Sequence, residues 1–242
     1  MSSSPEGGPA TAGVLFDLGN TLVRLDCGWL ALAASALAVA PIRADELERT
    51  EAAVRHDHEH PSADAASARA AFPAYLREVG RRVGLDPAAS SAFAREAMAE
   101  HSRRPYGLWD KAERGAAEVL ARLARGGVRL GVVSNNDGRA RALVDHLGFA
   151  PYLAVVVDSA IVGVRKPDAR IFTPALRALD LAPGRCLYVG DSYGHDVVGA
   201  RAAGLRALLY DPLGVWQGEA LDSVRTLGEV GDRVLGPPGR NL

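Results

Sequence analysis

The most regular feature of the chain is a set of short apolar runs, one near its start and the others in its second half. Val, Leu and Tyr dominate them, and such nearly continuous runs are typical of strands in a parallel sheet that is covered on both faces. The predicted strands are residues 13–18, 128–134, 153–158, 185–191 and 205–211.

Segments with helical periodicity separate these runs from Lys111 onward. The first helix is expected to begin at Lys111 and to stop at Gly126, and the second to begin at Asp137, a good N-cap residue. A third is expected to begin at Pro167, and a short fourth to stop at Gly204. The alternation predicts an α/β fold with a Rossmann-like, doubly wound parallel sheet and right-handed crossovers.

The pattern changes between the first apolar run and Lys111. Residues 26–105 are rich in alanine, have helical periodicity and contain no convincing strand. We therefore expect an inserted, all-helical cap domain of about four helices. The expected helix breaks are Pro41, Pro61 and Gly84.

The rest of the chain forms the expected core domain, residues 12–25 and 106–242, after a disordered lead-in at residues 1–11. The lead-in lacks the basic and apolar segments of a signal peptide. The apolar stretch at residues 29–42 is too short to span a bilayer, and we interpret it as a buried helix.

Composition narrows the classes of partner. The 242 residues are 48% hydrophobic and 24% charged, with a net charge of −1 and no block of like charge. These values are typical of a globular protein without a nucleic-acid or membrane partner. The two cysteines match no zinc or redox spacing, so a reduced, cytoplasmic setting is expected. The expected state of assembly is a monomer or a homodimer.

Polar side chains end four of the predicted strands. They are Asp17, Ser134, Asp158 and Asp191. Ligands of open parallel sheets bind at the carboxyl ends of the strands, so this edge is the predicted site. Lysine occurs only at Lys111 and Lys166, which leaves two candidates for any chemistry that needs a lysine.

Four segments in this order resemble the motifs of the haloacid dehalogenase superfamily. They are "DLGNT" from Asp17, "VVSNN" through Ser134, "RKPD" around Lys166 and "GDSYGHD" around Asp191. The resemblance covers residues 13–25 and 106–210. The helical insertion lies where that family carries its small helical cap, and the resemblance is to the phosphatase-like branch.

The resemblance implies a role for each motif. Asp17 would be the nucleophile that forms an aspartyl-phosphate, while Ser134 and Lys166 would stabilise the phosphoryl group. Mg²⁺ would be held by Asp17, the carbonyl of Gly19 and Asp191, with Asp196 as a further ligand or as a neighbour that orients one. The small phosphorylated substrate would also contact Asn135, Thr21 and His195.

Gly19 departs from the pattern of the family's phosphatases and mutases. They usually carry an Asp two residues after the nucleophile, which protonates the leaving oxygen and later activates water. Losing such a group typically costs about 10²- to 10⁴-fold in rate. A good leaving group, a water chain or His195 could supply the proton instead.

Other branches and classes remain open on the sequence. Metal-independent 2-haloacid dehalogenases also lack the second Asp, although the Gly190–Asp191 pair favours a metal site. Phosphonoacetaldehyde hydrolases need a cap lysine, whereas the insertion has none and Lys111 is expected to begin a core helix. A non-catalytic protein that binds a phosphorylated ligand would also be compatible with Gly19.

The insertion also contains "HDHEH", residues 56–60, which superficially resembles a metal-binding box. The order differs from H-E-x-x-H, and the segment precedes Pro61. We interpret it as a solvated surface segment, with a substrate-facing cap loop or an adventitious metal site as alternatives.

Overall fold

A computed structural model describes residues 11–57, 65–216 and 221–237, and it contains a six-stranded, wholly parallel sheet. The strand order is β5–β4–β1–β6–β7–β8. The strands are β1 Gly13–Phe16, β4 Arg129–Ser134, β5 Val155–Asp158, β6 Cys186–Gly190, β7 Arg206–Tyr210 and β8 Ser223–Val224. The predicted α/β fold with a Rossmann-like sheet is therefore confirmed.

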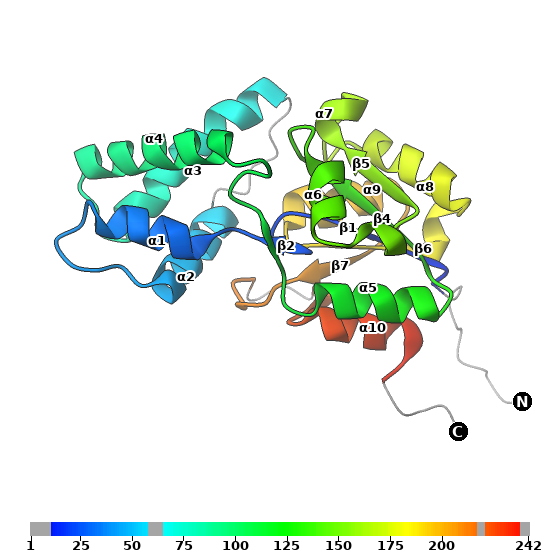
Figure 1. The fold of residues 1–242 in the computed structure, drawn as a ribbon. Coiled ribbons are helices and arrows are strands. Elements are labelled where there is room, and N and C mark those ends of the chain that lie inside the picture. Colours follow the sequence, from blue (N-terminus) through cyan, green and yellow to red (C-terminus); the bar gives the residue numbers. More distant parts are fainter. Residues whose placement is uncertain (1–10, 58–64, 217–220, 238–242) are drawn as a thin grey trace, which may run out of the picture.

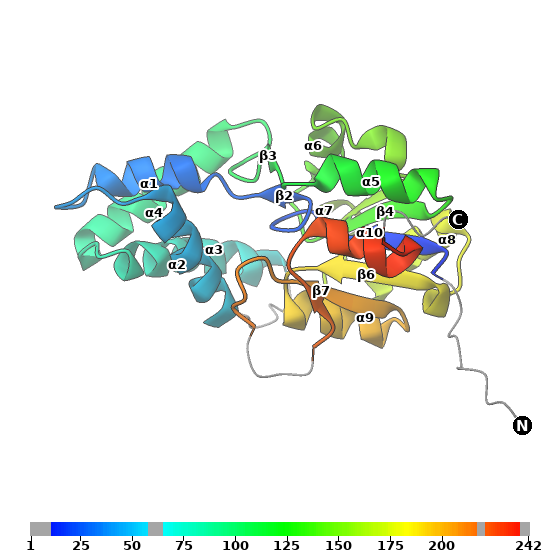
Figure 2. The same ribbon diagram turned by 90° about the horizontal axis from the view of Figure 1, so that it is seen from below.

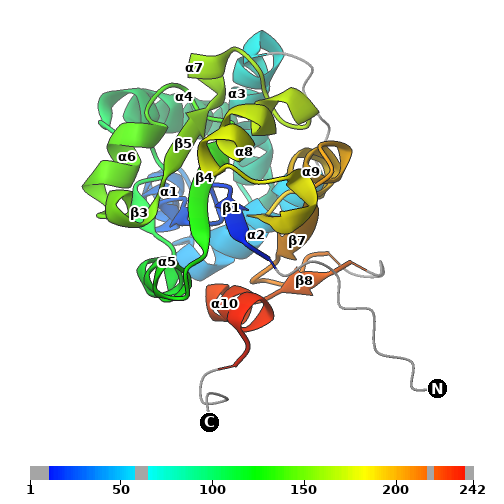
Figure 3. The ribbon, with the colours of Figure 1, turned by 90° about the vertical axis from the view of Figure 1, so that its right-hand side faces the viewer.

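Helices cover both faces of the sheet, as Figure 3 shows. One face packs against α5 Ala116–Arg125, α6 Ala140–His146 and α10 Leu227–Leu235. The other packs against α8 Thr173–Leu179 and α9 Val198–Ala202. Alternate residues of β1 point to opposite faces, with Val14 and Phe16 in the first core and Leu15 in the second. Burial on both faces explains why the strands are continuously apolar.

In the described part of the chain, four helices lie between the short strands β2 Val23–Arg24 and β3 Lys111–Ala112. They are α1 Cys27–Ser35, α2 Ala44–Asp57, α3 Ala65–Arg82 and α4 Pro87–Arg103. They share a core of their own, which includes Leu30, Leu47, Leu76 and Phe93. Figures 1 and 2 show them as a group beyond the end of the sheet toward which β6 points.

The expected helix start at Lys111 is wrong. Lys111 and Ala112 form β3, which pairs antiparallel with Arg24 and Val23 of β2. The N–H of Glu113 also donates to the carbonyl of Leu22. The backbone groups of this segment therefore find hydrogen-bond partners on the segment that leads into the helices. The helix α5 begins only at Ala116, after the positive φ of Gly115.

The expected N-cap at Asp137 is also wrong. The helix α6 begins at Ala140, and the N–H groups of Gly138 and Ala140 donate to Oδ2 of Asp158 at 3.0 and 3.1 Å. Asp158 also accepts from the N–H of Ala160 at 2.9 Å and so caps α7 Ser159–Val162. A carboxylate from the neighbouring strand thus replaces the local one, and Asp158 has a structural role.

The apolar stretch at residues 29–42 is buried only in part. Its helix α1 ends at Ser35, with Leu30, Ala31 and Ala34 buried but Leu32 73% exposed and Val39 fully exposed. Among the described residues, no helix is both long and apolar enough to cross a membrane. The strand β8 and the helix α10, which packs against α5, extend the fold beyond the predicted elements.

Candidate active site

Three strand ends bring the predicted site residues together. Asp17 follows β1, Ser134 ends β4 and Asp191 follows β6, and all three are buried. The strands β4 and β6 are the two direct neighbours of β1, so the three side chains meet at one edge. The N–H of Asp17 donates to the carbonyl of Val189 at 2.8 Å, which fixes the backbone at the first of these ends.

Lys166 lies at the centre of the site and is 2% exposed. Its Nζ donates to Oδ1 of Asp17 and Oδ1 of Asp196, both at 2.6 Å, and to the hydroxyl of Tyr188 at 2.8 Å. These three acceptors match the three ammonium protons. Burial alone would lower the pKa of Lys166, but Asp17 and Asp196 outweigh it and raise the pKa, so the amine stays charged.

Burial and the neighbouring carboxylates disfavour the charged forms of Asp17 and Asp191. Burial raises the pKa of Asp17, against the opposing effect of Lys166 and together with the charge of Asp196. Burial also raises the pKa of Asp191 to about 8; Arg55 opposes this shift, while Asp196 and Asp17 add to it. The cluster is therefore short of positive charge.

The cluster has the chemistry of a site for a hard divalent cation. Asp17, Asp191 and Asp196 each offer a carboxylate oxygen, and the three atoms lie within 4.8 Å of one another. Carboxylate oxygens are the ligands that Mg²⁺ prefers. The side chains present therefore fit the metal that the family motifs imply.

Both carboxylate oxygens of Asp196 have hydrogen-bond partners within the site. Its Oδ1 accepts from Lys166, and its Oδ2 accepts from the N–H of Ser192 at 3.0 Å. A Cβ on Gly190 would lie 2.3 Å from Cγ of Asp196, so only glycine fits beneath it. Asp196 therefore connects Lys166 with the turn that follows β6, and all three carboxylates remain candidate ligands of the metal.

Two residues expected to contact substrate are engaged with the protein. The amide of Asn135 pairs with the backbone of Lys166, accepting its N–H at 2.8 Å and donating to its carbonyl at 3.0 Å. The buried hydroxyl of Thr21 donates to Oδ1 of Asp191 at 3.4 Å. These contacts favour positioning roles for both residues in place of direct substrate binding.

His195 lies in the π-helical turn Tyr193–Val197 that follows Asp191. Its Nδ1 lies 3.0 Å from the hydroxyl of Ser192, which also accepts the N–H of His195. Burial lowers the pKa of His195, against the opposing charge of Asp196, so its imidazole is mainly neutral at neutral pH.

The packing around position 19 does not require glycine there. A Cβ at this position would lie 3.7 Å from Cδ1 of Trp109, which is ordinary van der Waals contact. The indole Nε1 of Trp109 donates to Oδ1 of Asn20 at 2.9 Å, and Asn20 adopts a positive φ of 54°. The turn after Asp17 is thus anchored by Trp109 on the side where a larger residue would project.

Several site residues escaped the sequence reasoning. Tyr188 binds Lys166 and donates to the carbonyl of Val133 at 2.8 Å, and its polar side chain within an apolar strand could have revealed it. Arg55 of α2 forms an ion pair with Asp191 across the gap between helices and sheet. No local signal singles out Arg55, because the insertion contains many arginines.

The "HDHEH" segment is described only in part, because His58 to His60 lie outside the described residues. His56 is half-buried, and its ring packs edge-on against Trp216 with centroids 4.5 Å apart. Trp216 also lies 5.7 Å from the ring of Tyr193. His56 therefore joins an aromatic contact between α2 and the sheet domain, and the interpretation of the remaining segment stays a prediction.

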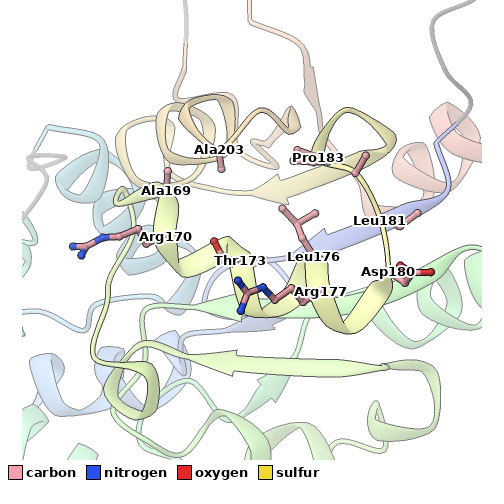
Figure 4. Close-up of a pocket in the computed structure, with 10 residues that line it drawn as sticks. Ala169, Arg170, Thr173, Leu176, Arg177, Asp180, Leu181, Pro183 and Ala203 are labelled. Carbon is pink, nitrogen blue, oxygen red and sulfur yellow. The ribbon is translucent and has the colours of Figure 1, made fainter.

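A separate groove of about 650 Å³ lies on the α8 side of the sheet (Figure 4). Its lining includes Thr173, Leu176, Arg177 and Pro183, and the residues of the acidic cluster are not part of it. The groove is therefore unrelated to the chemistry at the strand ends.

Comparison with known proteins gives a consistent picture. The family model for haloacid dehalogenase-like hydrolases matches residues 11–204. A phosphoserine phosphatase of Thermus thermophilus is 36% identical over 149 residues, which are 60% of this chain and 58% of that protein. A phosphoglycolate phosphatase of Rhodospirillum rubrum is 36% identical over 136 residues, or 56% of this chain and 55% of that protein. The chain thus spans little more than half the length of these curated relatives.

Solved structures show the same fold at lower identity. A phosphatase from Thermococcus onnurineus aligns with a TM-score of 0.58 and 21% identity, over 93% of this chain and 97% of that one. A 2-haloacid dehalogenase from Pseudomonas syringae aligns with a TM-score of 0.51 and 23% identity, over 90% and 96% of the two chains. Because both chemistries occur on this fold, function must be argued from the site.

Proposed function

Because the chain belongs to the haloacid dehalogenase-like hydrolases, we propose that it is a Mg²⁺-dependent phosphatase of a small phosphomonoester. The observation that carries the proposal is the buried lysine Lys166, which lies between Asp17 and Asp196 and beside Asp191. Relatives named as phosphoserine and phosphoglycolate phosphatases support it.

Asp17 would act as the nucleophile. One carboxylate oxygen bonds to phosphorus while the bond from phosphorus to the ester oxygen breaks, and the leaving alcohol takes a proton. Water then adds to phosphorus and releases one proton, which replaces the proton taken by the alcohol, while the bond from Asp17 to phosphorus breaks and inorganic phosphate leaves. Mg²⁺, when bound by Asp17 and Asp191, supplies positive charge that offsets the repulsion between Asp17 and the phosphoryl oxygens.

Lys166 and Ser134 would stabilise the charge that develops on the phosphoryl group. The amine is charged and fixed by three acceptors, so it needs little reorganisation during the reaction. Ser134 ends the strand next to the one that carries Asp17, where its hydroxyl can donate to a phosphoryl oxygen.

The leaving group still needs a proton, because Gly19 has no side chain to provide one. His195 is our candidate for this proton transfer. The donor would be its imidazolium, the minor form at neutral pH, acting through Nε2 because Nδ1 lies beside the hydroxyl of Ser192. Undiminished turnover of a His195→Ala protein on an alkyl phosphate would remove His195 from the mechanism.

A screen of phosphomonoesters with Mg²⁺ and with a chelator tests the proposal. We expect turnover only with the metal, and a loss of at least about 10³-fold in kcat/KM for Asp17→Asn. Absence of metal-dependent turnover on every phosphomonoester would favour a non-catalytic binding protein. Metal-independent release of chloride from a 2-chloro acid would instead show a dehalogenase.

A further inference from the structure

Arg55 brings a positive charge from α2 to the acidic cluster. One edge of its guanidinium, through Nη1, contacts Oδ2 of Asp191. Its Nε donates to Oε1 of Glu51, one turn earlier on α2, at 3.1 Å. The side chain is 26% exposed and lies between α2 and the acidic cluster.

Glu51 is a buried carboxylate inside the helical group and is only 4% exposed. Its Oε1 also accepts a hydrogen bond from the hydroxyl of Tyr75 on α3. Burial, and then the neighbouring Glu51, raises the pKa of Tyr75 well above its ordinary value, so the hydroxyl remains a donor. Tyr75 and Glu51 therefore hold Arg55 in one orientation, which reduces the entropy lost when it binds a ligand.

The direction of the displacement would carry the leaving group away from Asp17 and toward the helices. Attack by Asp17 is in line, so the ester oxygen and its substituent point away from the nucleophile. The helices α1–α4 lie beyond the strand ends (Figures 1 and 2), and α2 carries Arg55 to Asp191. Within the described part of the chain, the hydrogen bonds of Arg55 use Nε and Nη1, which leaves Nη2 for a ligand.

Arg55 brings a second cation to the site, separate from the one that contacts the proposed nucleophile. Lys166 is already fixed beside Asp17. Arg55 reaches the cluster from α2, and the donors of its guanidinium that Glu51 and Asp191 do not use can bind a carboxylate or a phosphate of the substrate.

We propose that Arg55 is the specificity-determining residue of the site and selects phosphomonoesters that carry a second anionic group. Glu51 and Tyr75 are positioning residues that act through Arg55. This inference rests on the proposed phosphatase function, and it adds the class of substrate: a phosphorylated acid or a bisphosphate.

Matched pairs of phosphate esters test the inference. 3-Phosphoglycerate and glycerol 3-phosphate differ in one carboxylate, as do 2-phosphoglycolate and ethyl phosphate. We expect kcat/KM to favour the acid in at least one pair, and Arg55→Met to reduce that preference by at least about tenfold. Arg49→Met is the matched control, since Arg49 lies on the same helix but pairs with the exposed Asp45 at 3.1 Å.

Arg55→Met leaves Glu51 buried without its partner, which can destabilise the helical group. The double variant Glu51→Gln/Arg55→Met removes that charge and should show the same loss of preference. Tyr75→Phe should raise KM for the phosphorylated acid severalfold, while kcat/KM for the matched ester without the carboxylate stays unchanged. An equal loss on the acid and the neutral ester, or no preference in either pair, would overturn the inference.

Binding separates this inference from the proposed function. Calorimetric titration of the Asp17→Asn protein with 3-phosphoglycerate and with glycerol 3-phosphate requires no turnover. Tighter binding of the acid that depends on Arg55 would support the inference even if the protein hydrolysed neither ester. Equal Kd values within this pair and also within the pair of 2-phosphoglycolate and ethyl phosphate, titrated in the same way, would overturn it even if the protein were an active phosphatase.

Discussion

Among single residues, Gly19 bears most directly on how the leaving group is protonated. It leaves the proposed nucleophile Asp17 without a neighbouring proton donor, yet a Cβ there would meet only ordinary contact with Trp109 at 3.7 Å. The backbone does not require glycine through a positive φ either, whereas the next residue, Asn20, does adopt one. An acidic side chain at position 19 is therefore compatible with the turn.

Gly19→Asp should increase the rate on a substrate with a poor leaving group. An alkyl phosphate should gain at least about tenfold in kcat, because protonation of its leaving oxygen limits the reaction. p-Nitrophenyl phosphate, which leaves without help, should change little and serves as the control. An unchanged ratio of the two rates would contradict the assignment of Gly19 as a lost proton donor.

At the scale of elements, Asp158 connects one strand with two helices. Its two carboxylate oxygens accept the N–H groups of Gly138, Ala140 and Ala160 at the starts of α6 and α7. The residue ends β5, so it ties helix starts on the connecting loops to the edge of the sheet. Its carboxylate serves the packing of the elements around the site.

Asp158→Ala should lower the free energy of unfolding by about 2–3 kcal/mol, because buried N–H groups lose their acceptor. Denaturation in urea measures the loss. Asp168→Ala is the control: Asp168 accepts the N–H of Arg170 at 2.9 Å on the surface, and its loss should cost less than about 1 kcal/mol. Equal losses for the two variants would show that Asp158 does not cap both helices.

At the scale of the whole molecule, Arg104 joins the two places where the chain passes between sheet and helices. Its Nη1 donates to Asp26, just before α1, at 2.8 Å and to Asp110, just before β3, at 3.2 Å. The N–H of Asp26 also donates to the carbonyl of Leu108 at 2.9 Å. These contacts set the position of the helical group over the strand ends.

Arg104→Met should loosen that arrangement and increase amide hydrogen exchange across α1–α4. Arg103→Met is the control, because Arg103 is exposed and contacts only Glu100 among the described residues. Equal exchange in the two variants would argue against a role for Arg104 in fixing the helical group.

Arg104→Met should also change how the stability of the protein depends on pH. Burial would raise the pKa of Asp26, but the hydrogen bond from Arg104 and that from Trp29 outweigh it, and the pKa lies below the ordinary 3.8. A lowered pKa contributes stability above pH 3.8, and this contribution is lost as the pH falls through the folded-state value. The difference in thermal stability between wild type and Arg104→Met should therefore be largest near neutral pH and shrink in acid.

Predictions from the sequence succeeded where a feature depends on neighbouring residues, and they failed where it depends on residues far apart in the chain. Buried strands and the ordered motifs around Asp17, Ser134, Lys166 and Asp191 were predictable, because apolar runs and strand ends are local features. The start of α5 was not, because Lys111 pairs with β2, a strand almost ninety positions earlier. The N-cap of α6 failed for the same reason, since its acceptor is Asp158 on β5.

The sequence by itself determined the α/β fold, the family and the set of carboxylates at the strand ends, because periodicity and motif order are recorded in neighbouring residues. Only the tertiary structure decided which oxygens Lys166 binds, that Asn135 and Thr21 face protein groups, and that Arg55 reaches Asp191. Those contacts join residues far apart in the chain, and their geometry depends on how the helices pack over the sheet. The sequence therefore predicts which motifs form the site, and the fold determines how their side chains contact one another.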